Sequence, residues 1–284
     1  MNQTVTLGGR TIGFADFGPA DGTPVIWCHG GPGSRLEPRV LVGEAAATGF
    51  RMIGVDRPGY GLSPPQPGRT IGGWAPEALA VADRLDIGRF VAAGTSTGGA
   101  YALALAALAP ARVLGVVACC AMTDMRCPEC RSTMSPPHAL AVWDAPDRDA
   151  AMAAAVDAHG PDGSKMADMA SHLCATDLAL FTDPEWVATT RAEMPEMFAF
   201  GLEGYTDDRL ADGGGWHTFD PGAITCPVIV LHGGSDVIVA VAQAEHTTAL
   251  VPGAVLRVFD ELGHFSIMSE LVPALTDVLP RGHT

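Results

Sequence analysis

Basic charge is scarce in this chain of 284 residues. Lysine occurs only at Lys165, and 17 lysines and arginines face 32 aspartates and glutamates, which leaves a formal net charge of −15. Such an acidic chain repels the phosphates of nucleic acids and the anionic surface of membranes. General nucleic-acid binding and membrane-surface binding are therefore excluded from the expected functions.

The chain also has no recognisable secretory leader and no convincing membrane span. Residues 1–7 contain no basic segment followed by an apolar core, so we expect a cytoplasmic protein. Residues 90–123 carry a single charge, at Arg112, and would be long enough for a membrane helix. Glycine and proline interrupt this stretch at five positions: Gly94, Gly98, Gly99, Pro110 and Gly115. The interruptions favour a buried strand, a buried helix and a second buried strand, as in the middle of a parallel sheet.

Cysteine spacing does not complete a metal site or a disulfide framework. The chain has seven cysteines, an odd number, and no leader that would indicate an oxidising compartment. Cys127 and Cys130 have C-x-x-C spacing, but there is no second pair and no thioredoxin-like context. We interpret them as two free thiols in a loop, with a redox or metal role as the alternative. We expect neither a cofactor nor a metal.

Short apolar runs alternate with helical stretches along most of the chain. Residues 4–17 alternate around two glycines, which predicts an antiparallel hairpin. Further strands are expected at residues 25–28, 51–55, 90–93, 113–118, 228–231 and 255–259. Helices are expected at residues 74–85, 97–109, 240–250 and 267–279. This alternation predicts an α/β fold with a mainly parallel, doubly wound sheet flanked by helices.

The alternation breaks between Ala121 and Pro227, where no buried strand is evident. We interpret residues 122–220 as a mostly helical cap on a core made of residues 1–121 and 221–284. The cap holds 18 acidic and 6 basic side chains, which is −12 of the total −15. Eight of the eleven methionines also fall there: Met122, Met125, Met134, Met152, Met166, Met169, Met194 and Met197. Because methionine fills irregular space, they indicate either an adaptable apolar pocket or ordinary packing of the cap.

The strongest chemical signal is the G-x-S-x-G pattern at residues 94–98. It stands between a predicted strand and the predicted helix that begins near Thr97. A turn this tight holds its central residue in a strained conformation and needs small neighbours. The serine hydroxyl then projects above the sheet, and the helix N-terminus offers N–H groups to a developing oxyanion. Ser96 is therefore the predicted nucleophile.

A second glycine-rich segment, His-Gly-Gly-Pro-Gly-Ser at residues 29–34, follows the predicted strand at 25–28. In a serine hydrolase of this layout, small residues here let backbone N–H groups approach the substrate carbonyl oxygen. The N–H groups of Gly31 and Thr97 are the predicted oxyanion hole. The segment has neither the Lys-Ser/Thr of a Walker loop nor G-x-G-x-x-G, which argues against a nucleotide loop.

Two further residues follow predicted strands near the C-terminus. Asp236 follows the strand at 228–231, and His264 follows the strand at 255–259. Serine is a poor nucleophile unless an imidazole takes its proton and a carboxylate holds that imidazole in the required tautomer. The chain order Ser, Asp, His predicts a triad of Ser96, Asp236 and His264. Asp124, after the strand at 113–118, is the rival acid.

With these motifs the chain resembles the α/β-hydrolase superfamily over essentially its whole length. Residues 56–63, Asp-Arg-Pro-Gly-Tyr-Gly-Leu-Ser, resemble its D-x-x-G-x-G-x-S segment, whose role there is mainly structural. Residues 29–33 are similar to a segment of proline iminopeptidases. Those enzymes usually have a Trp in the elbow and D-Q-R-G after the fourth strand, where this chain has Thr-Ser-Thr and Asp-Arg-Pro. Dehalogenases and epoxide hydrolases carry Asp at the elbow, so Ser96 argues against both.

The favoured interpretation is a serine hydrolase that cleaves small or medium carboxylic esters through an acyl-enzyme. Its partner is then a small-molecule ester or amide. The first alternative is a proline-iminopeptidase-like aminopeptidase, in which acidic cap side chains hold the substrate ammonium. The second is a hydrolase-fold ligand receptor with slow turnover, against which the complete triad and the oxyanion glycines argue.

Overall fold

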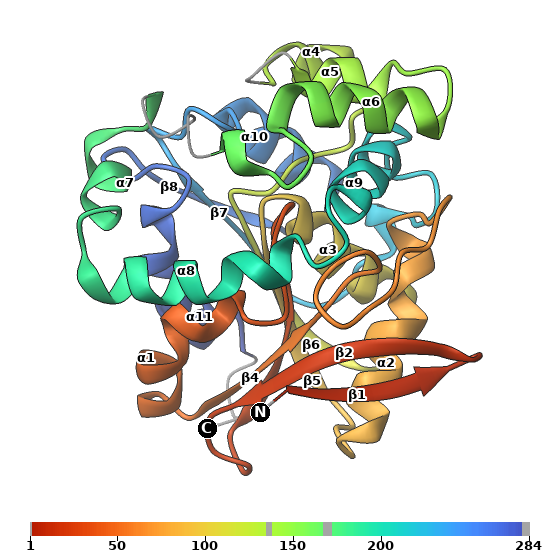
Figure 1. Cartoon of the computed structure of the whole chain (residues 1–284). Helices are drawn as coiled ribbons and strands as arrows, with labels where there is room; N and C mark the ends of the chain where they lie inside the picture. The colour runs from red at the N-terminus through yellow and green to blue at the C-terminus, as the bar shows by residue number, and fades with distance from the viewer. Residues whose placement is uncertain (1, 135–137, 167–171, 280–284) are drawn as a thin grey trace.

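A computed structural model describes residues 2–134, 138–166 and 172–279. Its centre is an eight-stranded sheet with the order β1-β2-β4-β3-β5-β6-β7-β8 (Figure 1). The strands are β1 Asn2–Leu7, β2 Arg10–Phe17, β3 Thr23–Cys28, β4 Phe50–Val55, β5 Phe90–Thr95, β6 Val113–Cys119, β7 Val228–Gly233 and β8 Val255–Phe259. β1 and β2 pair antiparallel with each other, and β2 pairs antiparallel with β4. All other neighbours are parallel, so the predicted hairpin and the mainly parallel sheet are confirmed.

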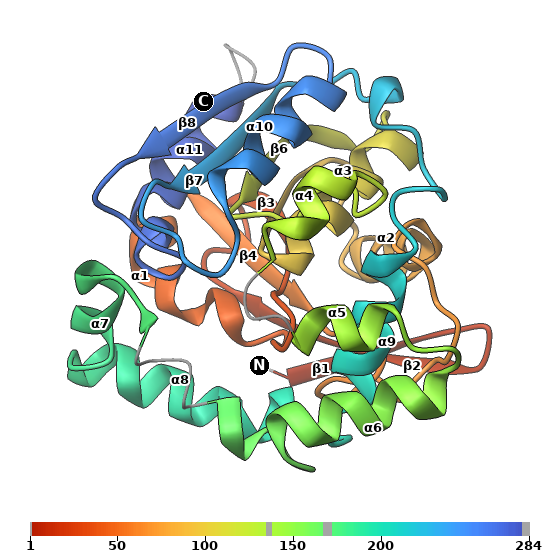
Figure 2. The same ribbon diagram turned by 90° about the horizontal axis from the view of Figure 1, so that it is seen from above.

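Helices cover both faces of this sheet (Figure 2). One face packs against α1 (Val42–Ala47) and α11 (Leu271–Val278). The other packs against α2 (Ala75–Arg84), α3 (Thr97–Leu108) and α10 (Val241–Leu250). Every residue of β5, β6 and β7 is buried, because a strand with helices on both faces has no solvent side. This explains why these strands are continuous apolar runs rather than alternating ones.

The sequence placed the core helices well, with two differences at their ends. The helix predicted at residues 267–279 begins as an α-helix only at Leu271, because Ser266–Glu270 forms a 3-10 turn. The helix α1 was not predicted, since six residues are too few to show a helical period. The apolar stretch at residues 90–123 forms β5, α3 and β6, as expected. Within the described residues, no helix combines the length and apolarity needed to cross a bilayer.

Among the described residues, six α-helices lie between β6 and β7. They are α4 Pro128–Ser132, α5 His138–Trp143, α6 Arg148–His159, α7 Ala175–Leu180, α8 Pro184–Met197 and α9 Glu203–Gly213. They gather over one end of the sheet (Figure 1), and we call residues 122–220 the insertion. Asp147 accepts Ala150 N–H at 2.9 Å and Asp183 accepts Trp186 N–H at 2.8 Å, which caps the starts of α6 and α8. Within the described residues the insertion contains no strand.

The insertion has a small apolar core of its own. Val142, Ala151, Ala155, Leu202 and Tyr205 are buried against one another, which joins α5, α6 and the start of α9. These helices therefore pack against one another as well as against the core.

The segment that follows β4 is held by a fully buried carboxylate. Asp56 accepts Arg35 N–H at 2.7 Å, Arg35 Nη1 at 3.0 Å and Leu62 N–H at 2.9 Å. Ser63 Oγ donates to Asp56 O at 3.0 Å and accepts Gly13 N–H at 2.9 Å. These bonds fix the turn against β2, which is the structural role that the sequence predicted for this segment.

Candidate active site

Ser96 occupies the turn between β5 and α3. Its φ of +51° lies in the left-handed region, which is costly for a residue with a side chain. A Cβ on Gly94 would lie 2.5 Å from Gly98 O, and a Cβ on Gly98 would lie 2.0 Å from Cys28 O. The two glycines therefore let the turn close, and the strained backbone is the one expected of a nucleophile elbow.

His264 and Asp236 meet at the ends of neighbouring strands. His264 Nδ1 and Asp236 Oδ2 are 2.7 Å apart, and Asp236 Oδ1 accepts the N–H groups of Ile238 at 2.8 Å and Val239 at 2.9 Å. Burial raises the pKa of Asp236, but the charge and hydrogen bond of His264 outweigh burial and hold it below its usual range. Burial lowers the pKa of His264, but the Asp236 carboxylate outweighs that effect and holds it well above its usual range. The carboxylate thus orients the ring and stabilises its protonated form.

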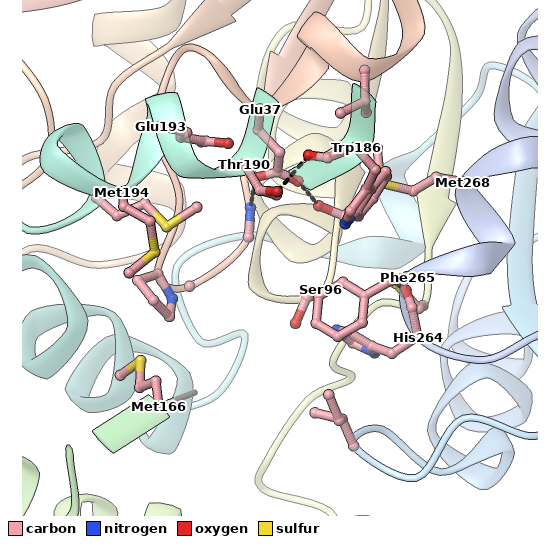
Figure 3. A pocket seen from close by; sticks show the side chains of 18 of the residues that line it. Glu37, Ser96, Met166, Trp186, Thr190, Glu193, Met194, His264, Phe265 and Met268 are labelled. Atoms are coloured by element: carbon pink, nitrogen blue, oxygen red, sulfur yellow. Dashed lines mark hydrogen bonds between the residues drawn. The ribbon is translucent and has the colours of Figure 1, made fainter. Parts of the chain in front are cut away.

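Ser96 and His264 line the same pocket, side by side (Figure 3). Asp236 occupies His264 Nδ1, so Nε2 is the ring nitrogen left for the serine. Among the described residues Ser96 Oγ has no hydrogen-bond partner. Such bonds are often long in a ligand-free site and tighten when substrate binds.

The rival acid Asp124 lies in a different environment. Its carboxylate accepts Arg126 Nε at 3.0 Å and Trp216 N–H at 3.3 Å. Burial raises the pKa of Asp124, but the hydrogen bonds of Arg126 outweigh burial and leave it below its usual range. Among the described residues the imidazole of His264 pairs with the carboxylate of Asp236 and not with that of Asp124.

The two predicted oxyanion donors flank Ser96. Gly31 lines the pocket, and Thr97 is the first residue of α3, immediately after the serine. In the described part of the chain, neither backbone N–H has a hydrogen-bond acceptor. A Cβ on Gly31 would lie 2.9 Å from Thr97 Oγ1, so the two residues are close neighbours. The two predicted donors therefore lie close together beside Ser96.

A buried charge network from α9 holds the loop that carries Gly31. Arg57 donates to His29 O and, at 2.7 Å, to Gly30 O. Asp208 of α9 binds the same guanidinium at 3.0 and 2.8 Å, and both side chains are fully buried. Burial raises the pKa of Asp208, but the charges of Arg57 and Arg69 outweigh it and hold it well below its usual range. Sequence motifs gave no sign of Asp208, because its partners lie far away in the chain.

The pocket has a volume of about 350 Å³ and is mostly apolar. The insertion supplies much of its wall: Met166, Leu173, Phe181, Trp186, Met194, Met197 and Phe198. The remaining methionines of the insertion pack elsewhere, namely Met122, Met125, Met134 and Met152. Met169 lies outside the described residues. The methionines therefore divide between the two predicted roles, pocket and packing.

Two carboxyl groups line this apolar pocket, the half-buried Glu37 and the buried Glu193, and neither belongs to a motif that the sequence shows. Glu37 accepts Gly30 N–H at 2.6 Å and also binds the Thr95 hydroxyl. Glu193 of α8 accepts Ser34 Oγ at 2.9 Å. Burial raises the pKa of Glu37 to about 7 and, with the charge of Glu37, raises that of Glu193 to about 8. Both groups can therefore change charge near neutral pH.

Another buried acid of the insertion, Asp177 of α7, contacts the loop that carries His264. It accepts the N–H groups of His264 at 2.8 Å, Phe265 at 3.1 Å and Ser266 at 2.8 Å, and the hydroxyl of Ser266 at 2.7 Å. A Cβ on Gly263 would lie 2.4 Å from Asp177 Oδ2. The approach is possible only because residue 263 is glycine. The sequence shows the glycine before His264, but it does not show that Asp177 approaches this glycine.

Sequence comparison places these features within a known family. Residues 23–271 match the family described as alpha/beta hydrolase fold. A non-heme chloroperoxidase of Streptomyces lividans is 35% identical over 100 residues, which are 35% of this chain and 36% of that protein. A proline iminopeptidase of Neisseria gonorrhoeae is 34% identical over 109 residues, 37% of this chain and 35% of that protein. These matches span about a third of the length of the curated relatives.

Solved structures share the fold over nearly the whole chain. A hydrolase from Pseudomonas aeruginosa PA01 has a TM-score of 0.73 at 20% identity, covering 98% of this chain and 96% of that one. A thermophilic esterase from Thermogutta terrifontis has a TM-score of 0.68 at 23% identity, covering 98% and 97%. Identities this low show the fold alone. The match to the family extends over most of the chain and includes both strands that precede the elbow and the base, and so the chain belongs to the alpha/beta hydrolase fold family.

Proposed function

We propose that this protein is a serine hydrolase that cleaves small to medium carboxylic esters through an acyl-enzyme. The observation that carries the proposal is the convergence of the strained Ser96 turn and the 2.7 Å His264–Asp236 pair on one apolar pocket. In the proposed reaction, His264 Nε2 takes the proton of Ser96 Oγ while the oxygen attacks the ester carbonyl. Asp236 keeps the imidazole in the required tautomer and stabilises its positive charge.

The oxyanion that forms is the group that Gly31 and Thr97 would bind through their N–H groups. His264 then gives its proton to the departing alcohol. In the second half of the reaction His264 takes a proton from a water molecule, whose oxygen attacks the acyl carbonyl. Ser96 Oγ leaves with the proton that His264 returns, and the acid is released. The insertion acts as a cap in this proposal, because α8 supplies much of the pocket wall. The pocket volume of about 350 Å³ suits a small or medium ester.

Replacement of the nucleophile tests the proposal. Ser96→Ala should lower kcat for p-nitrophenyl acetate by roughly 10³-fold or more, because the acyl-enzyme can no longer form. A fluorophosphonate probe should label the wild type and leave the variant unlabelled. Near-normal turnover by the variant, or its labelling, would remove Ser96 from the mechanism. An initial burst without steady turnover would favour a slow ligand receptor instead.

A second candidate function, an aminopeptidase, is favoured by the two carboxyl groups in the pocket. Glu37 and Glu193 could hold the ammonium group of a substrate beside Ser96. The resemblance of residues 29–33 to proline iminopeptidases points in the same direction. Turnover of prolyl p-nitroanilide against p-nitrophenyl acetate separates the two functions. A kcat/KM that is higher for the anilide and lost in Glu193→Gln would favour the aminopeptidase.

A further inference from the structure

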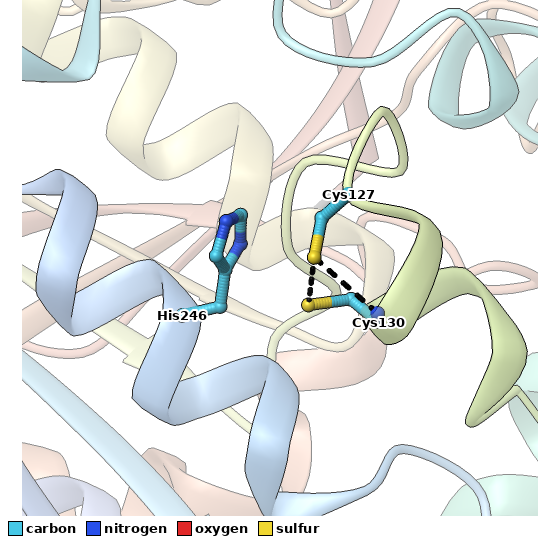
Figure 4. Close-up of side chains that lie close together, drawn as sticks. All are labelled: Cys127, Cys130 and His246. Atoms are coloured by element: carbon cyan, nitrogen blue, oxygen red, sulfur yellow. Dashed lines mark hydrogen bonds between the residues drawn. The ribbon is translucent and has the colours of Figure 1, made fainter.

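Two cysteines and a histidine converge outside the pocket, where the insertion begins (Figure 4). Cys127 lies immediately before α4, Cys130 lies within it, and His246 projects from α10 of the core. One donor atom from each residue lies within 4.8 Å of the other two, and the sulfur atoms are 2.7 Å apart. The fold therefore adds a third possible metal ligand, the distant His246, to the two that the C-x-x-C spacing supplies.

We propose that Cys127, Cys130 and His246 bind a thiophilic divalent cation, with Zn²⁺ as the ion that this donor set suits best. Two thiolates and an imidazole are typical zinc ligands. Zinc lies about 2.3 Å from sulfur and about 2.0 Å from nitrogen, so tetrahedral donors stand roughly 3.5 to 4 Å apart. The three atoms need only small side-chain rotations to reach that spacing. Cys127 is partly exposed and has room to make one.

Neighbouring groups hold two of the three side chains in place. Thr123 Oγ1 lies 2.8 Å from His246 Nδ1 and orients the ring, and an ion bound through Nε2 would keep this contact. The N–H of Cys130 donates to Cys127 Sγ at 3.3 Å, which holds that sulfur at the start of α4.

A fourth ligand is available beside the three. Glu129 Oε2 lies 3.5 Å from Cys127 Sγ on the exposed side of the cluster, so its carboxylate or a water molecule can complete the tetrahedron. Binding releases the two thiol protons to solvent, because Zn²⁺ takes both cysteines as thiolates. The bound site with Glu129 then carries a net charge of −1, which its partly exposed position accommodates.

An ion here would fasten the beginning of the insertion to the core. α10 already contacts this segment through Gln243, whose Nε2 lies 3.4 Å from Thr133 Oγ1 and whose Oε1 accepts Thr123 N–H at 3.3 Å. None of the three proposed ligands lines the Ser96 pocket. The ion would therefore stabilise the attachment of the insertion without taking part in ester cleavage.

The same two cysteines could instead form a disulfide under a thiol oxidant, which would remove two hydrogens from the chain. The sulfur contact suits both outcomes. The imidazole, however, has no role in a disulfide, although one of its nitrogen atoms lies within 4.8 Å of both sulfur atoms. The position of His246 is thus the observation that favours the ion.

Cobalt binding to the full chain tests the proposal. The protein is reduced, stripped with a chelator and titrated with Co²⁺ without oxygen, and Zn²⁺ is then added. We expect one Co²⁺ per chain, with a thiolate-to-cobalt charge-transfer band and the visible absorption of a tetrahedral site, both abolished by Zn²⁺. Zn²⁺ should also raise Tm. Ester turnover should be the same with and without the ion.

Variants locate the site. Cys127→Ser should remove the charge-transfer band or weaken it strongly, and His246→Ala should weaken Co²⁺ binding by at least about 10-fold. Thr123→Val should weaken it by roughly 10- to 100-fold through loss of ring orientation. Cys226→Ser, which removes a partly buried thiol elsewhere, should bind Co²⁺ as the wild type does. Circular dichroism and Tm show whether each variant is folded. If Cys130→Ser does not fold, the variants at the partly exposed positions Cys127 and His246 locate the site by themselves.

Three results would overturn the proposal. The first is a wild-type chain that shows no charge-transfer band with Co²⁺. The second is a band that persists in Cys127→Ser and His246→Ala. The third is a chain isolated two hydrogens lighter, with a Cys127–Cys130 disulfide, whose reduced form binds no Co²⁺. That last result would identify the pair as redox-active instead.

Discussion

The carboxylate of Asp177 accepts the backbone N–H of His264 at 2.8 Å, although Asp177 belongs to the insertion and His264 to the core. Two further N–H groups and the Ser266 hydroxyl bind the same carboxylate. The insertion therefore does more than cover the pocket. It fixes the backbone from which the proposed base projects, so the position of α7 and the geometry of the base are coupled.

The first prediction concerns this contact. Asp177→Asn places an amide NH₂ against backbone N–H groups, so the loop should shift, and kcat/KM should fall roughly 10- to 100-fold because small misplacements of catalytic groups are costly. The loss should lie in kcat, with labelling of Ser96 by a fluorophosphonate slowed in the same proportion. Asp157→Asn makes the same charge change at an exposed position of α6 and should have little effect. A purely structural role would lower Tm and leave kcat of the folded enzyme unchanged.

The second prediction separates the two candidate acids. Asp236 holds His264, whereas Asp124 binds Arg126. Asp236→Asn should therefore lower kcat by about 10⁴-fold, because the wrong imidazole tautomer is then stabilised. Asp124→Asn should change kcat only slightly. Steady-state kinetics of both variants with one ester decides the question, and a crippled Asp124 variant beside an active Asp236 variant would reverse the assignment.

The third prediction uses pH. His264 must be neutral to accept a proton, and the Asp236 carboxylate favours its charged form and raises its pKa. Activity should accordingly be lost at low pH and rise through an apparent pKa above about 6.5, the ordinary value for histidine. Burial raises the pKa of the adjacent Cys120 thiol, so Cys120 stays neutral and adds no charge in this range. Burial lowers the pKa of nearby His232, which stays neutral as well.

Glu37 supplies a check on this pH profile. Its pKa of about 7 means that its negative charge develops in the same range and helps to hold the proton on His264. Glu37→Gln should thus move the inflection of kcat/KM to lower pH. Measurement of kcat/KM from acid to mildly alkaline pH tests both statements, and a flat profile would rule out a histidine base.

The fourth prediction concerns the charge of the pocket. The pKa of Glu193 is about 8, so the pocket becomes more negative as pH rises through this value. An ester whose acyl chain ends in a carboxylate should lose kcat/KM relative to its neutral analogue between roughly pH 6 and pH 9. High salt should shrink the difference, because the Debye length falls from about 10 Å at 0.1 M to about 3 Å at 1 M. Glu193→Gln should reduce the discrimination, and the exposed Glu185→Gln on the same helix should preserve it.

The fifth prediction concerns stability. Asp208 and Arg57 form a fully buried ion pair, so Asp208→Asn leaves buried cationic charge poorly compensated and should cost roughly 3 to 5 kcal/mol of unfolding free energy. Asp83 pairs with Arg112 at the surface, with 67% of its side chain exposed, and Asp83→Asn should cost less than about 1 kcal/mol. Urea denaturation of the two variants measures both values. Similar losses in the two would contradict the role assigned to the buried pair.

The sequence by itself determined the fold and the positions of the proposed triad. Strands buried on both faces must be continuously apolar, and a turn that holds a strained serine needs glycines around it, so β5, β6, β7 and Ser96 were readable as patterns. Asp236 and His264 were found for a related reason, since each directly follows a predicted strand at the edge where the loops of a parallel sheet gather.

Only the tertiary structure decided which distant side chains meet. Four acidic residues of the site belong to no local motif: Glu37, Asp177, Glu193 and Asp208. Each binds a partner far away in the chain, so no periodicity or short spacing in the sequence indicates it. Which methionines line the pocket depended in the same way on how the insertion packs over the sheet. The histidine beside Cys127 and Cys130 is the clearest case, since α10 lies next to that pair only because the start of the insertion packs against the core. A motif within one short segment can be recognised from the order of its residues. Contacts between distant segments depend on how the whole chain buries and packs its side chains.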